Sequence, residues 1–151
     1  MPRLRLSHIG ICVSDWKRSL RFYCEQLGFR YVSELELAGE PSETLLGLAD
    51  LRLRAVYLER DGVAIELLAY ESPGPLGDAE PRPMNRLGLT HLSLAVDDLD
   101  ALLAELERAG VRVLEETRIE VPRARTRAIF VTDPDGTRIE LVERPADAGG
   151  D

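Results

Sequence analysis

Two stretches of the chain alternate large apolar residues with small or polar ones, and each begins at a histidine. The first, HIGICV, covers residues 8–13, and the second, HLSLAV, covers residues 91–96. Strict alternation predicts a β-strand that buries only one of its faces. The large aliphatic side chains take the buried face. The histidine face carries small residues such as Gly10 and Ser93, so space is expected above it.

An acidic residue follows each of these strands, and a stretch with apolar positions at helical spacing comes next. Asp15 and Asp98 stand where a helix N-cap is expected. Gly28 and Gly110 stand where a helix ends in a left-handed residue. The pattern therefore predicts one helix between each aspartate and its glycine.

Three strand-like stretches follow each helix, and the last two of each set are joined by a hairpin turn, RDG in the first half and DPDG in the second. The order βαβββ therefore occurs twice. The expected strands cover residues 29–38, 51–60 and 63–70 in the first half, and 111–120, 124–132 and 137–144 in the second.

The two halves are copies of one module. RLRAVYLERDGVAIELL at 52–68 aligns with RTRAIFVTDPDGTRIELV at 125–142 when the second turn is one residue longer. Repetition of a whole βαβββ pattern indicates a duplicated unit, and we predict an α+β protein. The predicted organisation is a first module at 1–71, a Pro- and Gly-rich linker at 72–87, a second module at 88–145 and a disordered tail at 146–151.

Composition narrows the classes of function. The net charge of -8 argues against electrostatic binding of nucleic acid. No apolar run approaches the roughly 18 residues that span a membrane, and the N-terminus lacks the apolar stretch of a signal peptide, so a cytoplasmic protein is expected. Cys12 and Cys24 do not make a disulfide framework and are interpreted as small buried thiols.

Four residues with coordinating chemistry occupy equivalent positions in the two modules. His8 and His91 are the only two histidines, and Glu66 and Glu140 each lie in a last strand between two aliphatic residues that point to the buried face. One such Glu is readily explained as a solvent-facing position, and one such His as a structural residue. Two of each at equivalent positions favour a divalent-metal site with mixed nitrogen and oxygen ligands.

This ligand set predicts a particular chemistry. Two carboxylates neutralise a divalent ion, and two neutral imidazoles add affinity without charge. An octahedral ion keeps two open positions for adjacent oxygens of a small-molecule substrate, and it acts there as a Lewis acid. A glutamate that leaves the ion would serve as a general base, which makes Glu66 and Glu140 the catalytic candidates.

Arginines near the second hairpin are candidates for binding an anionic substrate. Arg123, Arg125 and Arg127 share one face if that stretch is a strand, and Arg138 shares its face with Glu140. A clamp for a carboxylate or phosphate, formed by Arg125, Arg127 and Arg138, is one interpretation. A solvated charged face is the other.

Several motifs resemble the vicinal oxygen chelate superfamily of glyoxalases, bleomycin resistance proteins and extradiol dioxygenases. They are HIGICVSD, FYCEQLGF and IELL in the first module, and HLSLAVDDLDALLAELERAGV and DPDGTRIELVE in the second. The resemblance covers residues 3–144. It implies a glyoxalase-like fold, in which the modules form a curved mixed sheet around a metal-containing cleft, and a homodimer. The positions that match the family's metal ligands are His8, Glu66, His91 and Glu140.

The resemblance also implies a range of reactions. Bacterial glyoxalase I is similar in its His, Glu, His, Glu set, and methylmalonyl-CoA epimerase is similar in the opening SHIGICVSD. Both stabilise an enediolate or enolate, so we expect a lyase or isomerase that uses one divalent ion of Zn, Ni, Co, Mn or Fe. An Fe(II)-dependent oxygenase is the alternative, although extradiol enzymes typically lack a ligand at the Glu66 position. A drug-binding resistance protein is the second alternative, and the scattered aromatic residues argue against it.

Overall fold

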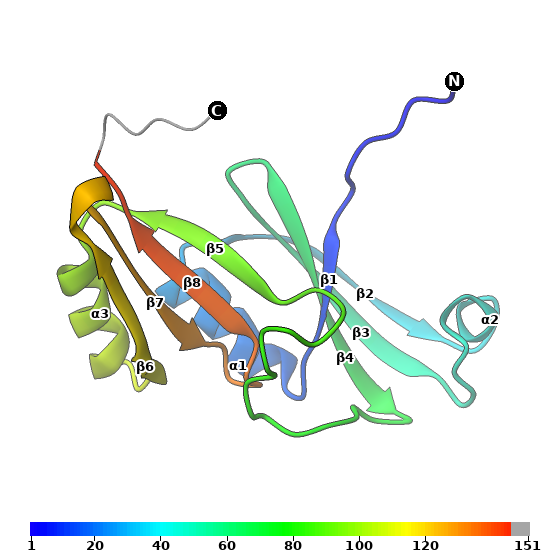
Figure 1. Ribbon diagram of the computed structural model, residues 1–151. Helices are drawn as coiled ribbons and strands as arrows, with labels where there is room; N and C mark the ends of the chain where they lie inside the picture. Colours follow the sequence, from blue (N-terminus) through cyan, green and yellow to red (C-terminus); the bar gives the residue numbers. More distant parts are fainter. Residues whose placement is uncertain (146–151) are drawn as a thin grey trace. The chain divides into compact units, whose positions relative to one another are not determined.

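The computed structural model describes residues 1–145 and divides the chain into two compact units, with the boundary between Gly77 and Asp78 (Figure 1). Each unit holds one four-stranded sheet. The first sheet contains β1 (Ile9–Cys12), β2 (Arg30–Ala38), β3 (Arg52–Arg60) and β4 (Val63–Ser72). The second contains β5 (His91–Val96), β6 (Val113–Val121), β7 (Thr126–Thr132) and β8 (Arg138–Glu143). The predicted tail at 146–151 lies outside the described residues.

The two sheets have the same topology. The strand order is β1-β4-β3-β2 in the first and β5-β8-β7-β6 in the second. The first and last strands of each unit run parallel, and the remaining neighbours are antiparallel. This confirms the predicted α+β architecture with two βαβββ modules. The parallel pairing matters for function because it places the histidine strand directly beside the glutamate strand in each unit.

The helices begin and end where the sequence predicts. The carboxylate of Asp15 accepts hydrogen bonds from the N–H groups of Lys17 and Arg18 and caps α1 (Trp16–Arg21), and Asp98 accepts one from Ala101 and caps α3 (Leu99–Arg108). The predicted C-terminal glycines have the expected left-handed backbone, with φ of 70° at Gly28 and 76° at Gly110.

The first unit contains further helical segments. Within the range predicted for one helix, between Asp15 and Gly28, the first helix continues as a π-helical turn over Phe22–Gln26. A short helix, α2 (Ser42–Leu46), lies between β2 and β3 of the first unit, and none of its residues is buried. The corresponding connection in the second unit carries a 3₁₀ turn, Pro122–Ala124.

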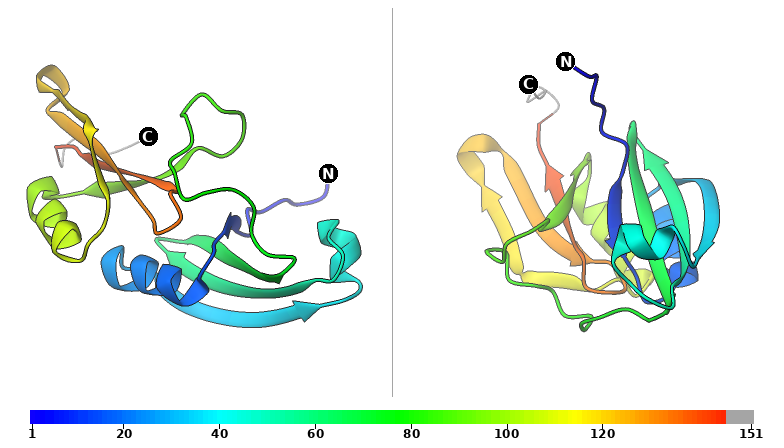
Figure 2. Two further views of the ribbon diagram at one scale, coloured as in Figure 1. Left: turned by 90° about the horizontal axis from the view of Figure 1, so that it is seen from below. Right: turned by 90° about the vertical axis from the view of Figure 1, so that its right-hand side faces the viewer.

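In each unit the helix packs on one face of its sheet, α1 against β4 and α3 against β8 (Figure 2). The buried apolar side chains of helix and sheet form the core on that face. Ile65 and Leu67 on β4, and Ile139 and Leu141 on β8, are 0% exposed. Full burial of such side chains contributes roughly 1.5–3 kcal/mol each. Because side chains alternate along a strand, this burial directs the glutamate between each pair of aliphatic residues to the opposite face.

The region of the second-module arginines differs from the prediction. The strand expected from residue 124 begins at Thr126, because Pro122–Ala124 forms a 3₁₀ turn and Arg125 adopts a left-handed φ of 46°. The condition for Arg123, Arg125 and Arg127 to share one strand face is therefore not met. Only Arg127 of the three belongs to a strand.

Arg127 joins the sheet of the second unit to the start of α3. Its guanidinium contacts Asp100 Oδ2 at 2.8 Å and Glu143 Oε2 at 2.9 Å, and the same Glu143 oxygen accepts the N–H of Leu99 at 2.7 Å. The hydrogen bond from Arg127, assisted by that backbone N–H, holds the pKa of Glu143 below its ordinary value. Glu143 has the same strand parity as Leu141, so Arg127 lies on the helix-covered face.

We expect Arg127→Gln to lower thermal stability at neutral pH. Because the folded-state pKa of Glu143 is depressed, its contribution is present above the unfolded pKa of about 4.3 and is lost as pH falls through the folded value. The difference in melting temperature between wild type and variant should therefore narrow from pH 7 to pH 3. Arg125→Gln is the matched control and should leave the melting temperature unchanged. Equal effects of the two substitutions would contradict this assignment.

We expect adjacent positions on β8 to respond oppositely to substitution. Leu141→Ala should lower the free energy of unfolding by about 2–5 kcal/mol, because it opens a cavity in the core. Glu140→Gln should change it by no more than about 0.5 kcal/mol, because that side chain lies on the open face. Urea denaturation of both variants checks the assignment of faces, and a large loss for Glu140→Gln would contradict it.

Candidate functional site

In the first unit, the predicted histidine and glutamate lie side by side. His8 immediately precedes β1, and Gly10 two residues later is the cross-strand partner of Glu66 on β4. His8 Nε2 lies 3.0 Å from Glu66 Oε2, and the two side chains are 35% and 13% exposed. The pair is therefore half-buried on the open face of the sheet, within reach of a ligand from outside.

A tyrosine completes this group. Tyr57 on β3 is the cross-strand partner of Glu66 and donates its hydroxyl hydrogen to Glu66 Oε1 at 2.6 Å. Its ring meets the His8 imidazole edge to face, with centroids 5.4 Å apart. The hydrogen bond to Glu66, together with burial, raises the pKa of Tyr57 to about 12, so the phenol remains a donor at neutral pH.

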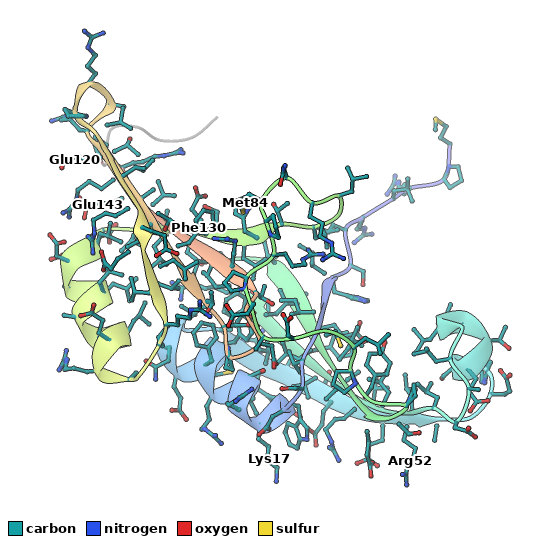
Figure 3. The ribbon with its side chains drawn as sticks, turned by 60° about the horizontal axis from the view of Figure 1, so that its bottom comes forward. Lys17, Arg52, Met84, Glu120, Phe130 and Glu143 are labelled. Atoms are coloured by element: carbon teal, nitrogen blue, oxygen red, sulfur yellow. The ribbon has the colours of Figure 1, made fainter. Side chains whose placement is uncertain are left out.

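The second unit repeats the arrangement with one difference. His91 begins β5, and its Nε2 lies 3.6 Å from Oε2 of Glu140 on β8, with both side chains 29% exposed. Phe130, which is labelled in Figure 3, lies on β7 as the cross-strand partner of Glu140. Its ring meets the His91 imidazole edge to face, with centroids 5.5 Å apart. Phe130 thus occupies the position of Tyr57 but carries no hydroxyl.

Both imidazoles are oriented by the residue that precedes them. Nδ1 of His8 lies 3.0 Å from Ser7 Oγ, and Nδ1 of His91 lies 2.8 Å from Thr90 Oγ1. In the tautomer that donates Nδ1–H to the hydroxyl, Nε2 presents its lone pair beside the carboxylate. Metal-binding histidines typically use the second ring nitrogen in this way.

The donor set of each unit is half of what a metal site needs. Over the described residues, 1–145, no group of three or more His, Cys, Asp or Glu side chains that could hold a metal ion is found. Each unit contributes one imidazole nitrogen and one carboxylate, which are suitable ligands for a divalent transition metal. The four-ligand site predicted from His8, Glu66, His91 and Glu140 requires both pairs and stays a prediction.

The open faces carry the small residues that the sequence pattern indicated. Gly10 and Cys12 on β1, and Ser93 and Ala95 on β5, are exposed. Tyr70 on β4 has the same parity as Glu66, and burial raises the pKa of its phenol. Cys12 is exposed rather than buried, which corrects the interpretation of this thiol as a core residue.

Of the three arginines considered for substrate binding, Arg138 alone lies on the face that carries Glu140. It is the cross-strand partner of His91, its guanidinium lies 5.4 Å from the Phe130 ring centroid, and its Nε donates to the Arg82 carbonyl at 3.1 Å. Arg127 lies on the opposite face in ion pairs, and Arg125 lies in the turn before β7.

Sequence reasoning missed the partners of the ligand pairs. Tyr57 and Phe130 align in the repeated segments AVY and AIF, and a hydroxyl residue precedes both histidines in SH and TH. These signals were present in the repeat. Their meaning depends on strand register, which pairs β3 with β4 and β7 with β8 residue by residue.

A separate groove of about 540 Å³ lies in the first unit, near the start of α1. It is lined in part by Trp16 and by Arg54, whose guanidinium lies 4.7 Å from the Trp16 ring centroid and pairs with Glu34 at 3.1 Å. Neither His8 nor Glu66 lines this groove, so it is distinct from the ligand pair.

Among the described residues, no helix is long and apolar enough to cross a bilayer.

The chain has clear relatives. It is 34% identical over 140 residues to the uncharacterised protein YaeR of Escherichia coli K12, covering 93% of this chain and 96% of that protein. It is 32% identical to a probable lactoylglutathione lyase of Vibrio cholerae, covering 99% and 98% of the two chains. It is also 29% identical to a 2-epi-5-epi-valiolone epimerase of an Actinomyces species, covering 93% and 80%.

A solved structure and a family model agree with these relatives. The fold matches that of a glyoxalase family protein from Bacillus cereus with a TM-score of 0.82 over 95% of this chain and 96% of that one, at 21% identity. The model of the Glyoxalase/Bleomycin resistance protein/Dioxygenase superfamily matches residues 5–141, which include both His–Glu pairs. The chain therefore belongs to the glyoxalase/bleomycin resistance protein/dioxygenase superfamily, as the sequence motifs implied.

Proposed function

We propose that this protein is a divalent-metal enzyme, a lyase or isomerase that moves a proton next to a carbonyl group. The observation that carries the proposal is the duplicated His–Glu pair, with each Nε2 and carboxylate oxygen 3.0 Å and 3.6 Å apart. His8, Glu66, His91 and Glu140 would hold one ion of Zn, Ni, Co, Mn or Fe. When bound, the ion supplies a Lewis acid that stabilises negative charge on two adjacent substrate oxygens.

The charges of the four residues suit this role. Two glutamates bring two negative charges to a divalent ion, so the loaded site is neutral. His8, His91 and Glu140 are 29–35% exposed and Glu66 is 13% exposed, so each pair is accessible to a small substrate. Arg138, on the face of Glu140, would attract a carboxylate or phosphate on that substrate.

The proton transfer falls to the carboxylates. Glu140 or Glu66 removes the proton from a carbon beside a carbonyl, the C–H electron pair forms a C=C bond, and the carbonyl electrons move to oxygen. The protonated carboxylate then returns its proton, to the neighbouring carbon in an isomerisation or to the opposite side of the same carbon in an epimerisation. In the isomerisation, a hydroxyl proton also moves between the two oxygens, so product and substrate have the same composition.

The names of two relatives are consistent with this step. Lactoylglutathione is a thioester of a 2-hydroxy acid, which a proton shift within a hemithioacetal produces. An epimerase inverts one stereocentre, and removal and return of a proton next to a carbonyl accomplishes that as well. The substrate class proposed here is therefore a small carbonyl compound with two oxygens that can reach one ion, such as the hemithioacetal of a 2-oxoaldehyde or an acyl thioester that also carries a carboxylate.

Two other functions within the superfamily are less well supported. An Fe(II)-dependent oxygenase of the extradiol type would leave the Glu66 position without a ligand role. Glu66 is instead fixed in place by Tyr57 at 2.6 Å and lies beside His8. A drug-binding protein would need open aromatic walls, whereas Tyr57 and Phe130 direct ring contacts at the imidazoles.

We expect metal-depleted protein to bind one Co²⁺, Mn²⁺, Ni²⁺ or Zn²⁺ per chain, measured by calorimetry. The loaded protein should incorporate solvent deuterium into the methylglyoxal–glutathione hemithioacetal or into methylmalonyl-CoA, measured by NMR. His91→Ala should abolish both binding and exchange, because it removes one imidazole ligand. Ser93→Ala, on the same face of β5, is the control and should retain metal binding. Metal binding without exchange on either substrate would reject the proposed reaction.

We further propose that the protein is a homodimer, and mixing variants tests whether one ion takes its ligands from two chains. One variant carries His8→Ala and Glu66→Ala, and the other carries His91→Ala and Glu140→Ala. If two chains share each site, mixed dimers regain one intact ligand set, and about one ion per mixed dimer should bind. If one chain holds the whole set, mixing restores no binding. Metal-loaded protein that sediments as a monomer would contradict the proposed dimer.

A further inference from the structure

The duplicated site is unequal because of one hydroxyl group. Tyr57 and Phe130 occupy equivalent positions, each as the cross-strand partner of the glutamate in its own unit. Each ring meets the neighbouring imidazole edge to face, at interplanar angles of 85° and 86°. The two rings therefore support the histidines in the same way. The hydroxyl of Tyr57, which Phe130 lacks, changes only the surroundings of the glutamates.

Glu66 is held from two sides. Oε1 accepts the Tyr57 hydroxyl at 2.6 Å and Oε2 lies 3.0 Å from His8 Nε2, and the side chain is only 13% exposed. A hydrogen bond of this length to a carboxylate belongs to the stronger, charge-assisted kind. Rotation of Glu66 away from His8 would break it and leave a partly buried carboxylate without that donor.

Glu140 has more freedom. Its side chain is 29% exposed, and within the described part of its own unit His91, at 3.6 Å, is the single polar side chain that lies beside its carboxylate. Phe130 offers its carboxylate no donor. Rotation of Glu140 therefore breaks no comparable hydrogen bond.

We propose that Tyr57 is a positioning residue that keeps Glu66 a fixed ligand and thereby assigns the proton transfer to Glu140. This inference rests on the proposed function and deepens it. A carboxylate that both holds the ion and takes a proton from the substrate would have to move. The Tyr57 hydrogen bond restrains Glu66, and within the described part of the second unit no such hydrogen bond restrains Glu140. The swapped pair of aromatic residues provides a matched test, because Tyr57→Phe and Phe130→Tyr each change one oxygen atom.

The first arm of the test is metal binding alone. Calorimetry with Co²⁺ on metal-depleted protein should show that Tyr57→Phe weakens affinity roughly 10- to 100-fold, the usual effect of removing a hydrogen bond to a metal ligand. The visible absorption spectrum of the Co²⁺ form should also change, which a purely structural role of Tyr57 would not produce. Thermal unfolding of the metal-free variant serves as the control for folding. Affinity and spectrum equal to wild type would overturn the inference.

The second arm is the rate of proton transfer. Phe130→Tyr gives Glu140 a hydroxyl partner and should lower kcat and solvent-deuterium exchange about tenfold with little change in KM, while Co²⁺ affinity stays at least as tight. Phe130→Leu removes the ring without adding a hydroxyl and should retain more of the exchange rate than Phe130→Tyr. Unchanged exchange in Phe130→Tyr would overturn the assignment to Glu140.

These outcomes separate the two proposals. If wild-type protein binds no divalent metal, the proposed function fails and this inference fails with it. If wild type binds metal and catalyses exchange, and neither aromatic substitution changes affinity or rate, only the inference fails.

Discussion

The arrangement of this protein depends on the alternation of side chains along the last strand of each unit. Ile65 and Leu67, and Ile139 and Leu141, enter the cores completely. Strand geometry then allows the glutamate between each pair one direction only, toward the open face. A shift of register by one residue would bury a carboxylate and expose two aliphatic side chains, so the hydrophobic cores fix the positions of the candidate ligands.

This constraint explains why much of the fold and of the candidate ligand pairs could be predicted from sequence. Strand periodicity, the aspartate caps and the terminal glycines are local signals, and the duplication made each of them appear twice. The association of His8 with Glu66 also followed, because both belong to the face of small residues. Their separation of 3.0 Å depends on the parallel pairing of β1 with β4, which brings the first and last strands of the unit together.

The remaining features depend on pairings that composition and periodicity do not encode. The start of β7 at Thr126 follows from a 3₁₀ turn and a left-handed Arg125, which disrupt an arginine pattern that looks regular in the sequence. The sequence pattern indicates that Arg127 lies in a strand, but it does not reveal the ion pairs of Arg127 with Asp100 and Glu143, which are 27 and 16 residues away. Contacts of this kind are set by packing of the helix on the sheet.

Duplication gives the two units equivalent His–Glu pairs, whereas the proposed proton transfer needs the two glutamates to differ. Two identical His–Glu pairs would hold an ion well, yet a ligand that is held firmly is a poor base, because a base must release the ion to reach the substrate. In the mechanism proposed above, one atom would separate these demands: the hydroxyl of Tyr57, which Phe130 lacks. Since both rings retain the same edge-to-face contact with their histidines, the difference alters the glutamates and leaves the imidazoles equally supported. A single substitution after duplication is therefore enough to give two equivalent carboxylates different freedom of movement.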